Sequence, residues 1–532
     1  MTKPTTPLLL LAIAALLVGC TRTWQGSNTF LPAAARGGGS DAALAQLAPT
    51  LAALPTGDPA LASSATLPPQ MPPAAIATAT RAPQNLGAAP TPDAPHSLPT
   101  LRSRADTYTI QNGDTLAKIA QSYQISLQAL LVANPSANPN LVYAGTVLAI
   151  PAPSPDDSGS AFKVIPDSEL VYGPKSADFD TVRFIQQKGG FLATYHETVD
   201  DTDTGGPQIV DRIAHEFSVN PRLLLAVLEY TSGWVTASNP TLTPRGYPMG
   251  YQDSAHTGLY RQLSWTADNL NRGFYLWKAN GLAMLSTPNG DVMPVAPTIN
   301  AGTAGVQYLF ALLRDKNGWR SAVSADGVYQ TFIDLFGNPF SFAVEPLIPP
   351  DLAQPKMQLP FEPGAAWSFT GGPHGGWAEG SAWAAIDFAP PGDSFGCYVS
   401  DAWAAAVTDG VIVRSGAGAV VEDLDGDGLE QTGWTVLYMH MATTDRIAVG
   451  THVHAGDHIG HPSCEGGVSN GTHMHLARRF NGVWIAADGP LPYVLDGWVS
   501  SGDGIEYDGY LTRNEQSIEA WDGRTPANQI QR

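Results

Sequence analysis

The stretch SNGTHMHLARR, at residues 469–479, contains two histidines, His473 and His475, separated by one methionine. Residues two apart lie on the same face of a β-strand, about 6–7 Å from each other, whereas in a helix they point in different directions. Polar and apolar residues alternate through THMHLARRF. We therefore predict a strand with both imidazoles on one face and Met474 and Leu476 on the other.

Other residues suited to the same chemistry precede this pair. His440 lies near the end of GWTVLYMHM, which predicts a strand with Trp434, Val436, Tyr438 and His440 on one face. His374 and Asp387 lie upstream in TGGPHGGWAEGSAWAAIDFAPPG. Two imidazoles and one carboxylate that leave a position open for water form a standard catalytic zinc set. Such a zinc ion lowers the pKa of its water, and further imidazoles move protons or stabilise an oxyanion.

The region that must position these residues begins near residue 361. Short runs rich in Trp, Gly and Val, separated by turn residues, predict an antiparallel β domain. The motifs TDGVIV, LYMHM, GTHVHAGDHIG and SNGTHMHLA follow His374 and IDFA in the order found in lysostaphin-type zinc endopeptidases of bacterial cell walls. This resemblance covers roughly residues 360–490, and it implies a compact antiparallel β domain with the metal in a groove.

The resemblance assigns His374, Asp387 and His475 as zinc ligands, and His440 and His473 as the non-ligand catalytic histidines. In that family three residues usually separate the first histidine from the aspartate. Here GGWAEGSAWAAI intervenes, so His374 must reach the metal across an insertion. The alternative is a domain without catalysis that only binds cell wall or a partner.

Residues 108–151 predict a small β-α-α-β unit. Leu116 and Ile119 recur at helical spacing, and Asp114 is placed to cap the first helix. The segment, including NGDT and NPNLVYAG, resembles a lysin motif (LysM). The family binds glycans that contain N-acetylglucosamine. The resemblance implies a groove lined by Gly113, Asp114, Thr115, Asn140 and Leu141.

Residues 161–350 predict mainly helices, because apolar residues recur at helical spacing in IVDRIAHEFSVNPRLLLAVLEY and TINAGTAGVQYLFALLRD. VNPRLLLAVLEYTSGW, TGLYRQLSWTADNL and NAGTAGVQYLFALL resemble the lysozyme-like fold of lytic transglycosylases. The resemblance implies that Glu229, at a helix end, is a general acid for a glycosidic bond. Tyr230 and GLYRQ depart from that family's motifs, so a structural or glycan-holding remnant is the alternative.

The N-terminal MTKPTTPLLLLAIAALLVGC has an apolar run from Leu8 to Val18 that is short for a membrane span, and it predicts a secretory signal. LVGC resembles a bacterial lipobox. This resemblance implies that Cys20 becomes the lipidated first residue; an ordinary signal peptide with an incidental cysteine is the alternative. The remaining cysteines, Cys397 and Cys464, predict one disulfide in an exported protein.

The net charge is −20 and charged residues make up 14% of the chain, so no basic footprint indicates nucleic-acid binding. Asp423, Asp425 and Asp427 in EDLDGDGLEQTGW match half of an EF-hand loop. Trp434 stands where that loop needs a bidentate glutamate. The sequence predicts an acidic hairpin tip, with a Ca²⁺ site as the alternative.

These patterns together predict a multidomain chain with a small βααβ LysM, a mainly α lysozyme-like middle domain and an antiparallel β zinc peptidase domain. We expect a peptidoglycan hydrolase, lipid-anchored to the membrane and facing the cell wall, that cleaves stem or cross-bridge peptides. The alternative is a non-catalytic peptidoglycan-binding regulator of other hydrolases. The expected segments are a signal peptide at 1–20, a disordered Ala/Pro/Thr-rich tether at 21–105, the LysM at 106–151, the helical domain at 161–350, the zinc domain at 355–495 and a C-terminal tail at 496–532.

Overall fold

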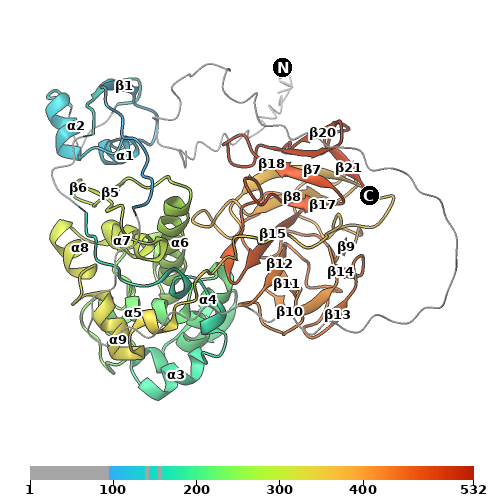
Figure 1. Cartoon of the computed structure of the whole chain (residues 1–532), viewed down its shortest axis with the longest axis horizontal. Helices are drawn as coiled ribbons and strands as arrows, with labels where there is room; N and C mark the ends of the chain where they lie inside the picture. Colours follow the sequence, from blue (N-terminus) through green and yellow to red (C-terminus); the bar gives the residue numbers. More distant parts are fainter. Residues whose placement is uncertain (1–94, 138–142, 154–158) are drawn as a thin grey trace, which may run out of the picture.

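The computed structural model describes residues 95–137, 143–153 and 159–532. Figure 1 shows a small N-terminal unit above a helical domain, with a β domain to the right of the helices. The predicted multidomain architecture of helices and antiparallel sheets is therefore confirmed. Among the described residues, no helix combines the length and the apolar character needed to cross a bilayer.

The N-terminal unit has the predicted β-α-α-β order and its own small core around Leu130. Its first helix is capped by Thr115, whose hydroxyl accepts from the Lys118 N–H, and not by Asp114 as the sequence suggested. Asp114 instead accepts hydrogen bonds from the Gln111 N–H and the Tyr108 hydroxyl, so it shapes the loop before the helix. The elements are β1 (Asp106–Thr109), α1 (Leu116–Ser122), α2 (Leu127–Ala133) and β2 (Val147–Ile150).

The helical domain is organised around α5 (Pro221–Ser232), which is buried along most of its length. Asn220 caps this helix, and Gly233 ends it with φ 73°. α6 and α7 pack closely because Gly305 faces Leu270, where a Cβ would lie 2.6 Å from the backbone oxygen. The other helices are α3 (Thr181–Lys188), α4 (Gly206–Phe217), α6 (Leu259–Lys278), α7 (Ala301–Leu313), α8 (Lys316–Ala322) and α9 (Val328–Phe336). Two hairpins complete the domain: β3 (His196–Val199) with β4 (Thr202–Gly205), and β5 (Met284–Ser286) with β6 (Val292–Pro294).

The β domain is dominated by an antiparallel sheet in the order β13-β10-β11-β12-β15-β8-β7-β21, with β16 beside β15. Its strands are β7 (Ala366–His374), β8 (Ala385–Ala389), β10 (Gly410–Gly416), β11 (Ala419–Asp423), β12 (Trp434–Met439), β13 (His452–Val453), β15 (Met474–Phe480), β16 (Val483–Trp484) and β21 (Gln529–Gln531). β9 (Ala404–Ala405) pairs with β14 (His458–Gly460). A second sheet contains β17 (Val494–Leu495), β18 (Trp498–Ser501), β19 (Tyr510–Arg513) and β20 (Gln516–Glu519).

The C-terminal segment is not a tail. Residues 496–532 form β18 to β21, and β21 pairs with β7 at the edge of the main sheet. Trp498, Leu511 and Ile530 are buried, so this segment contributes to the core of the β domain. The end of the predicted tether is also packed, because the His96 ring stacks on Trp277 of the helical domain.

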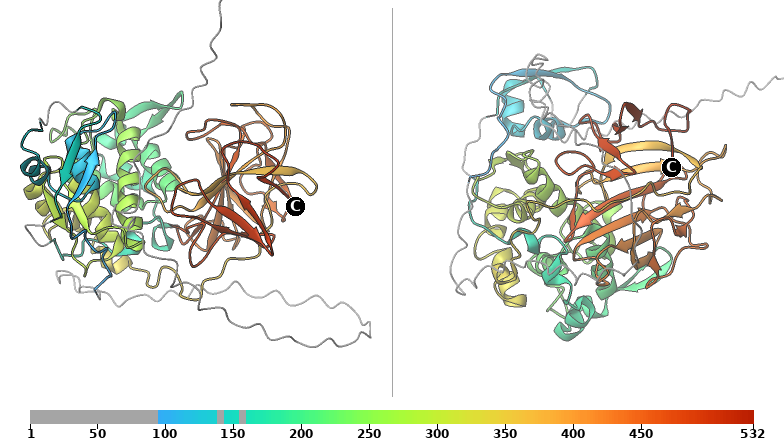
Figure 2. Two further views of the ribbon diagram at one scale, coloured as in Figure 1. Left: turned by 90° about the horizontal axis from the view of Figure 1, so that it is seen from above. Right: turned by 45° about the vertical axis from the view of Figure 1, so that its right-hand side comes forward.

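The main sheet has two different neighbours. On one face, Ile386 and Leu476 pack in a core with other β-domain residues. On the other face, Val421, Leu437 and Ala477 belong to a core that is continuous with the helical domain. Figure 2 shows the helical domain and the β domain lying directly beside each other. The predicted burial of Met474 and Leu476 away from the histidine face is confirmed.

Candidate metal centre

The candidate metal centre lies on β8 and β15 and at the end of β7. His475 of β15 is directly opposite Asp387 of β8, so both side chains project from the same face of the sheet. β7 pairs with β8 through register shifts on both sides of Gly371, and the shifts end at His374. Gly371 is needed at this point because a Cβ there would lie 2.8 Å from Asp387 Oδ2.

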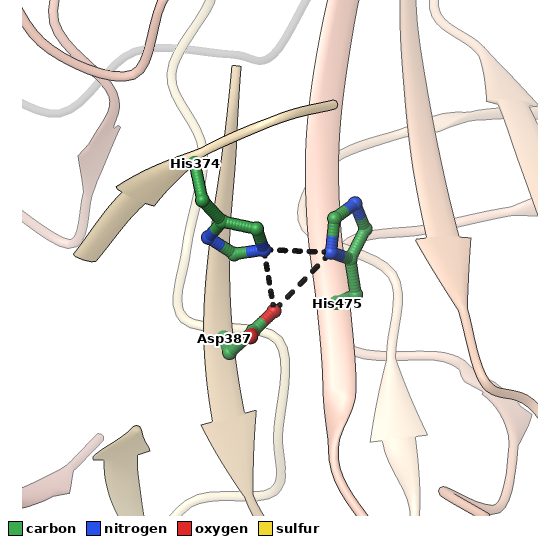
Figure 3. A group of neighbouring side chains, drawn as sticks. All are labelled: His374, Asp387 and His475. Carbon is green, nitrogen blue, oxygen red and sulfur yellow. Dashed lines mark hydrogen bonds and ion pairs between the residues drawn. The ribbon is translucent and has the colours of Figure 1, made fainter. Parts of the chain in front are cut away.

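Three potential ligand atoms converge at this point (Figure 3). His374 Nε2 lies 3.2 Å from Asp387 Oδ1, and His475 Nδ1 lies 3.3 Å from the same oxygen. The two imidazole nitrogens are 2.9 Å apart. The hairpin formed by β7 and β8 therefore brings His374 to the other two residues despite the insertion at 375–386.

The hydrogen bonds on the outer side of each imidazole define which nitrogen faces the centre. His374 Nδ1 is 2.8 Å from the Gly372 carbonyl oxygen, and His475 Nε2 is 3.1 Å from that of Gly376. A carbonyl oxygen only accepts, so these outer nitrogens carry hydrogens, and in the neutral imidazoles the inner nitrogens present lone pairs. Asp387 Oδ1 receives no hydrogen bond of normal geometry from the described residues.

Three electron-pair donors thus face one another in a buried place, which is unfavourable unless a cation lies between them. Two neutral imidazoles and one carboxylate suit Zn²⁺ with an open fourth position. Carbonyl groups behind ligating histidines are the usual outer partners that fix the ring orientation. The donor set and its surroundings therefore fit zinc.

Burial and neighbouring charges set the ionisation of the three residues. Burial opposes the charge of Asp387, but the adjacent His374 and His473 imidazoles outweigh it and hold the pKa of the carboxyl well below its usual range. Burial lowers the pKa of His475. At His374 burial acts in the same direction, but the Asp387 carboxylate overcomes it and raises the pKa. Asp387 is consequently anionic at neutral pH and available to a metal ion.

His440 and His473 lie beside these ligands without joining them. Their ring centroids are 4.5 Å apart, and the ring of His440 is 6.2 Å from that of His475. His473 Nδ1 bonds the Gly471 carbonyl at 2.8 Å, and His440 Nδ1 bonds the Glu465 carbonyl at 3.2 Å. In the neutral form of each ring, Nδ1 therefore carries the hydrogen and Nε2 has the free lone pair. Burial, reinforced by the two neighbouring imidazoles, lowers the pKa of His440 to about 3.

The prediction that His440 shares a strand face with Val436 and Tyr438 is wrong. Those two residues pack in the core on the far side of the sheet, and Met439 is the residue opposite His475. β12 ends at Met439, and His440 then adopts φ 65°, which is uncommon for a residue with a side chain. The side chain of His440 therefore does not follow the alternation of β12, and it lies on the same side of the sheet as the metal centre.

Two loops beside His473 are joined to each other. Cys397 and Cys464 form a disulfide, as the cysteine count suggested, with their Cα atoms 5.5 Å apart. The Thr472 hydroxyl accepts from the Tyr398 N–H at 2.9 Å, which adds a second connection between the same loops. The loop that precedes the histidine strand is thereby held against the segment around residue 397.

Tyr507 is a residue of the site that sequence patterns did not reveal. Its ring stacks on His374 with the centroids 4.2 Å apart and the planes at 19°. The Tyr507 N–H donates to the Pro373 carbonyl at 3.2 Å, which ties this C-terminal loop to the end of β7. The alternating apolar residues of YLTRNEQSIEA could have indicated that residues 496–532 form strands; no local signal pointed to the stacking itself.

Glu229 is not near the metal centre but at the end of α5. Its carboxylate accepts from the Val235 N–H at 2.9 Å, and from the N–H and the hydroxyl of Thr236. These bonds engage both carboxylate oxygens in closing the loop after the helix. The suggested role of Glu229 as a general acid stays a prediction.

The three aspartates of the acidic loop do come together, and Asp423 is buried. Their oxygens already bond the loop itself. Asp423 accepts from the Gly428 N–H at 2.9 Å, and Asp427 accepts from the Leu429 N–H at 2.9 Å and the Thr432 hydroxyl at 2.6 Å. These bonds are those of an acidic hairpin tip, and they account for the cluster without Ca²⁺.

The predicted glycan groove is described only in part. Gly113 adopts φ 88° in the loop before α1, with Asp114 and Thr115 next to it. Asn140 and Leu141 lie outside the described residues, as does Cys20. The groove itself therefore stays a prediction.

Comparison with known proteins identifies two segments of the chain. Residues 108–151 match the LysM domain model, and residues 163–350 match the model of the LasA N-terminal domain. Protease LasA of Pseudomonas aeruginosa is 27% identical over 315 residues, which is 54% of this chain and 69% of the relative.

Two solved structures are also similar. Pseudoalterin, an M23 metalloprotease from the deep sea, has 24% identity and a TM-score of 0.28, with 34% of this chain and 100% of the other covered. The catalytic domain of lysostaphin from Staphylococcus simulans has 22% identity and a TM-score of 0.17, covering 24% and 89%. The chain is therefore similar to Protease LasA over about half of its length, and matches to the LysM domain and the LasA N-terminal domain precede the β domain that holds the candidate metal centre.

Proposed function

We propose that this protein is a peptidoglycan hydrolase whose β domain is a zinc-dependent endopeptidase. The observation that carries the proposal is the convergence of three lone-pair donors, from His374, Asp387 and His475, in one buried place. A structural role alone would not require two further imidazoles beside them. His440 and His473 supply these, and both direct their accepting nitrogen away from a backbone carbonyl.

The chemistry follows from these positions. A bound zinc ion would supply a Lewis acid and a water of lowered pKa. His440 is neutral at physiological pH because burial lowers its pKa to about 3, and its Nδ1 bonds the Glu465 carbonyl, so its Nε2 would orient the water or the substrate as a hydrogen-bond acceptor. His473 Nε2 faces the carboxylate of Asp387 at 3.7 Å, where it is able to hold a proton for the leaving amine or stabilise an oxyanion.

The proposed substrate is an amide of the stem or cross-bridge peptides of peptidoglycan. The support for this choice is the LysM domain on the same chain. Residues Gly113, Asp114 and Thr115, together with Asn140 and Leu141, would hold the glycan strand. Weak binding there raises the local concentration of peptide near the β domain without any new contact at the metal.

The same proposal includes the location of the protein. The apolar run before Cys20 supports export, and LVGC supports lipidation of Cys20, so that residues 21–94 would connect the membrane to the folded domains. In this arrangement the protein faces the cell wall. A lysozyme-like activity at Glu229 is a second, separate proposal, supported by its position at the end of α5.

The test is a zymogram with the purified full-length protein in a gel that contains peptidoglycan. We expect a cleared band that a chelator abolishes and zinc restores, with new peptide amines among the products. A protein that binds one zinc and binds cell wall, yet releases no amines, would instead be the non-catalytic regulator. New reducing ends that persist in the chelator would assign activity to Glu229.

A further inference from the structure

The insertion between His374 and Asp387 forms a loop, residues 375–384, that touches both the metal centre and the helical domain. At its inner end, the Gly376 carbonyl accepts from His475 Nε2 at 3.1 Å. This bond determines that His475 presents Nδ1 to the other two ligands. The position of Gly376 therefore controls the orientation of a ligand ring.

Gly376 rests on Trp484, since a Cβ at Gly376 would lie 2.7 Å from a carbon of the indole ring. Trp484 is in turn held by the helical domain. Its backbone N–H donates to the Tyr275 hydroxyl at 2.9 Å, and its indole N–H donates to the Phe217 carbonyl at 3.3 Å. The inner end of the loop thus lies on a residue that α4 and α6 fix in place.

The outer end of the loop contacts α6 directly. The Gly380 N–H donates to Asp268 Oδ1 at 2.6 Å, and Arg272 Nη2 lies 3.1 Å from Glu379 Oε2. There is no spare room at this contact, because a Cβ at Gly380 would lie 1.9 Å from the Asp268 backbone oxygen. Asp268 and Arg272 are both mostly buried, with side chains 19% and 16% exposed.

The two ends of the loop are connected by short internal bonds. The Gly376 N–H donates to the Ala382 carbonyl at 3.0 Å, and the Trp377 N–H donates to the Ser381 hydroxyl at 3.0 Å. The Ser381 hydroxyl donates to the Ala378 carbonyl at 3.2 Å. A loop linked in this way moves as a unit, so a displacement at its outer end reaches Gly376.

We propose that Asp268 and Arg272 of the helical domain are positioning residues for the metal centre. They hold the loop against α6, and the loop holds the ring of His475 in the orientation that the metal requires. This inference rests on the proposed zinc function of the β domain. In this proposal the segment that matches the LasA N-terminal domain helps to position the ligands of the metal centre.

The direct test is Gly380→Ala in the full-length protein, with Gly416→Ala as the matched control. A Cβ at Gly416 would have no other atom within 4 Å, so this substitution meets no neighbour. The zinc dissociation constant is measured by competition with a chromogenic chelator. We expect Gly380→Ala to weaken zinc binding by about 10-fold, as loss of an outer partner does, and the control to stay within about twofold.

A second set of variants separates positioning from general stability. Asp268→Ala removes the acceptor for the Gly380 N–H, whereas Asp268→Asn keeps an oxygen there and should restore most of the zinc affinity. Arg261→Ala is the control on the same helix, because Arg261 is exposed and donates a local hydrogen bond to the Ala255 carbonyl. Melting temperatures are measured in the presence of chelator, where the metal does not contribute.

The outcomes are distinct. If wild-type protein bound no zinc, the proposed function would fail. If it bound zinc and both Gly380→Ala and Asp268→Ala, folded by circular dichroism, bound it equally tightly, the positioning role would be refuted while the function stood. Should Gly380→Ala not yield folded protein, the difference between Asp268→Ala and Asp268→Asn decides; equal affinity in those two variants refutes the proposal.

Discussion

Replacing His475 and His473 separately by alanine should divide metal binding from catalysis, although the two residues are only two positions apart. His475 Nδ1 lies 2.9 Å from His374 Nε2 and 3.3 Å from Asp387 Oδ1, inside the group of ligand atoms. His473 Nε2 lies 3.7 Å from Asp387 Oδ2, whereas the other two ligand atoms lie near Oδ1 of the same carboxylate. The two substitutions therefore remove different functions.

The magnitudes follow from this geometry. Structural zinc sites bind with roughly 10–16 kcal/mol shared among four ligands, or about 2.5–4 kcal/mol for each. His475→Ala should therefore weaken zinc binding by roughly 70- to 900-fold. His473→Ala removes an outer contact and should change the affinity by no more than about 10-fold, but it should reduce turnover by about 10²- to 10⁴-fold, as loss of an acid–base group does.

The assay combines chelator competition with the rate of cleavage of a soluble peptidoglycan peptide at saturating zinc. His454→Ala is the matched control, because its side chain is 86% exposed and it follows β13, which β10, β11 and β12 separate from β15 in the sheet. Equal loss of zinc from the His473 and His475 variants would refute the division of roles. Full activity of His473→Ala would refute its catalytic role alone.

Three other predictions concern different parts of the chain. Changing both Cys397 and Cys464 to serine should reduce the free energy of unfolding by about 4 kcal/mol, because the disulfide closes a loop with a sequence separation of 67 and so restricts the unfolded chain. Peptide mapping that finds both cysteines as free thiols in the wild type would contradict this prediction. Deleting 106–151 should slow hydrolysis of insoluble wall but not of a soluble peptide; equal losses on both would show that the LysM supports the catalytic structure. Burial raises the pKa of Glu422 to about 8, so the folded protein favours the protonated form of this carboxyl group. The wild type should therefore lose stability relative to Glu422→Gln as pH rises from about 4.5 to 8, and parallel melting temperatures across that range would disprove it.

The shared face of His473 and His475 was accessible from sequence because strand periodicity is local, whereas the roles of the residues in the metal centre came from a family resemblance. His473 and His475 had to share a face once the segment was a strand, and Met474 and Leu476 had to face the core. Periodicity misplaced His440, since the strand ends one residue earlier and a positive φ redirects the side chain. Alternation applies only inside an element, and the ends of elements are not fixed by it.

The C-terminal segment and the loop at 375–384 show a second limit. Residues 496–532 are short strands whose partners lie far away in the chain, so β21 becomes recognisable only when β7 is next to it. The loop contains no motif of its own. Its role depends on the contact with α6, which lies more than one hundred residues earlier in the chain. No local sequence pattern encodes that contact.

The sequence by itself determined the β-α-α-β order of the N-terminal unit, the helical character of the middle region and the antiparallel β domain after it, and it offered Cys397 and Cys464 as a disulfide pair. These follow from residue types and short-range spacing, whereas the proposed roles of the histidines and Asp387 come from a family resemblance. Only the tertiary structure decided which nitrogen of each histidine faces the centre, how His374 reaches it, and that the helical domain packs against the same sheet face. The physical reason is that side-chain orientation and domain contact depend on hydrogen bonds and close packing between residues distant in sequence.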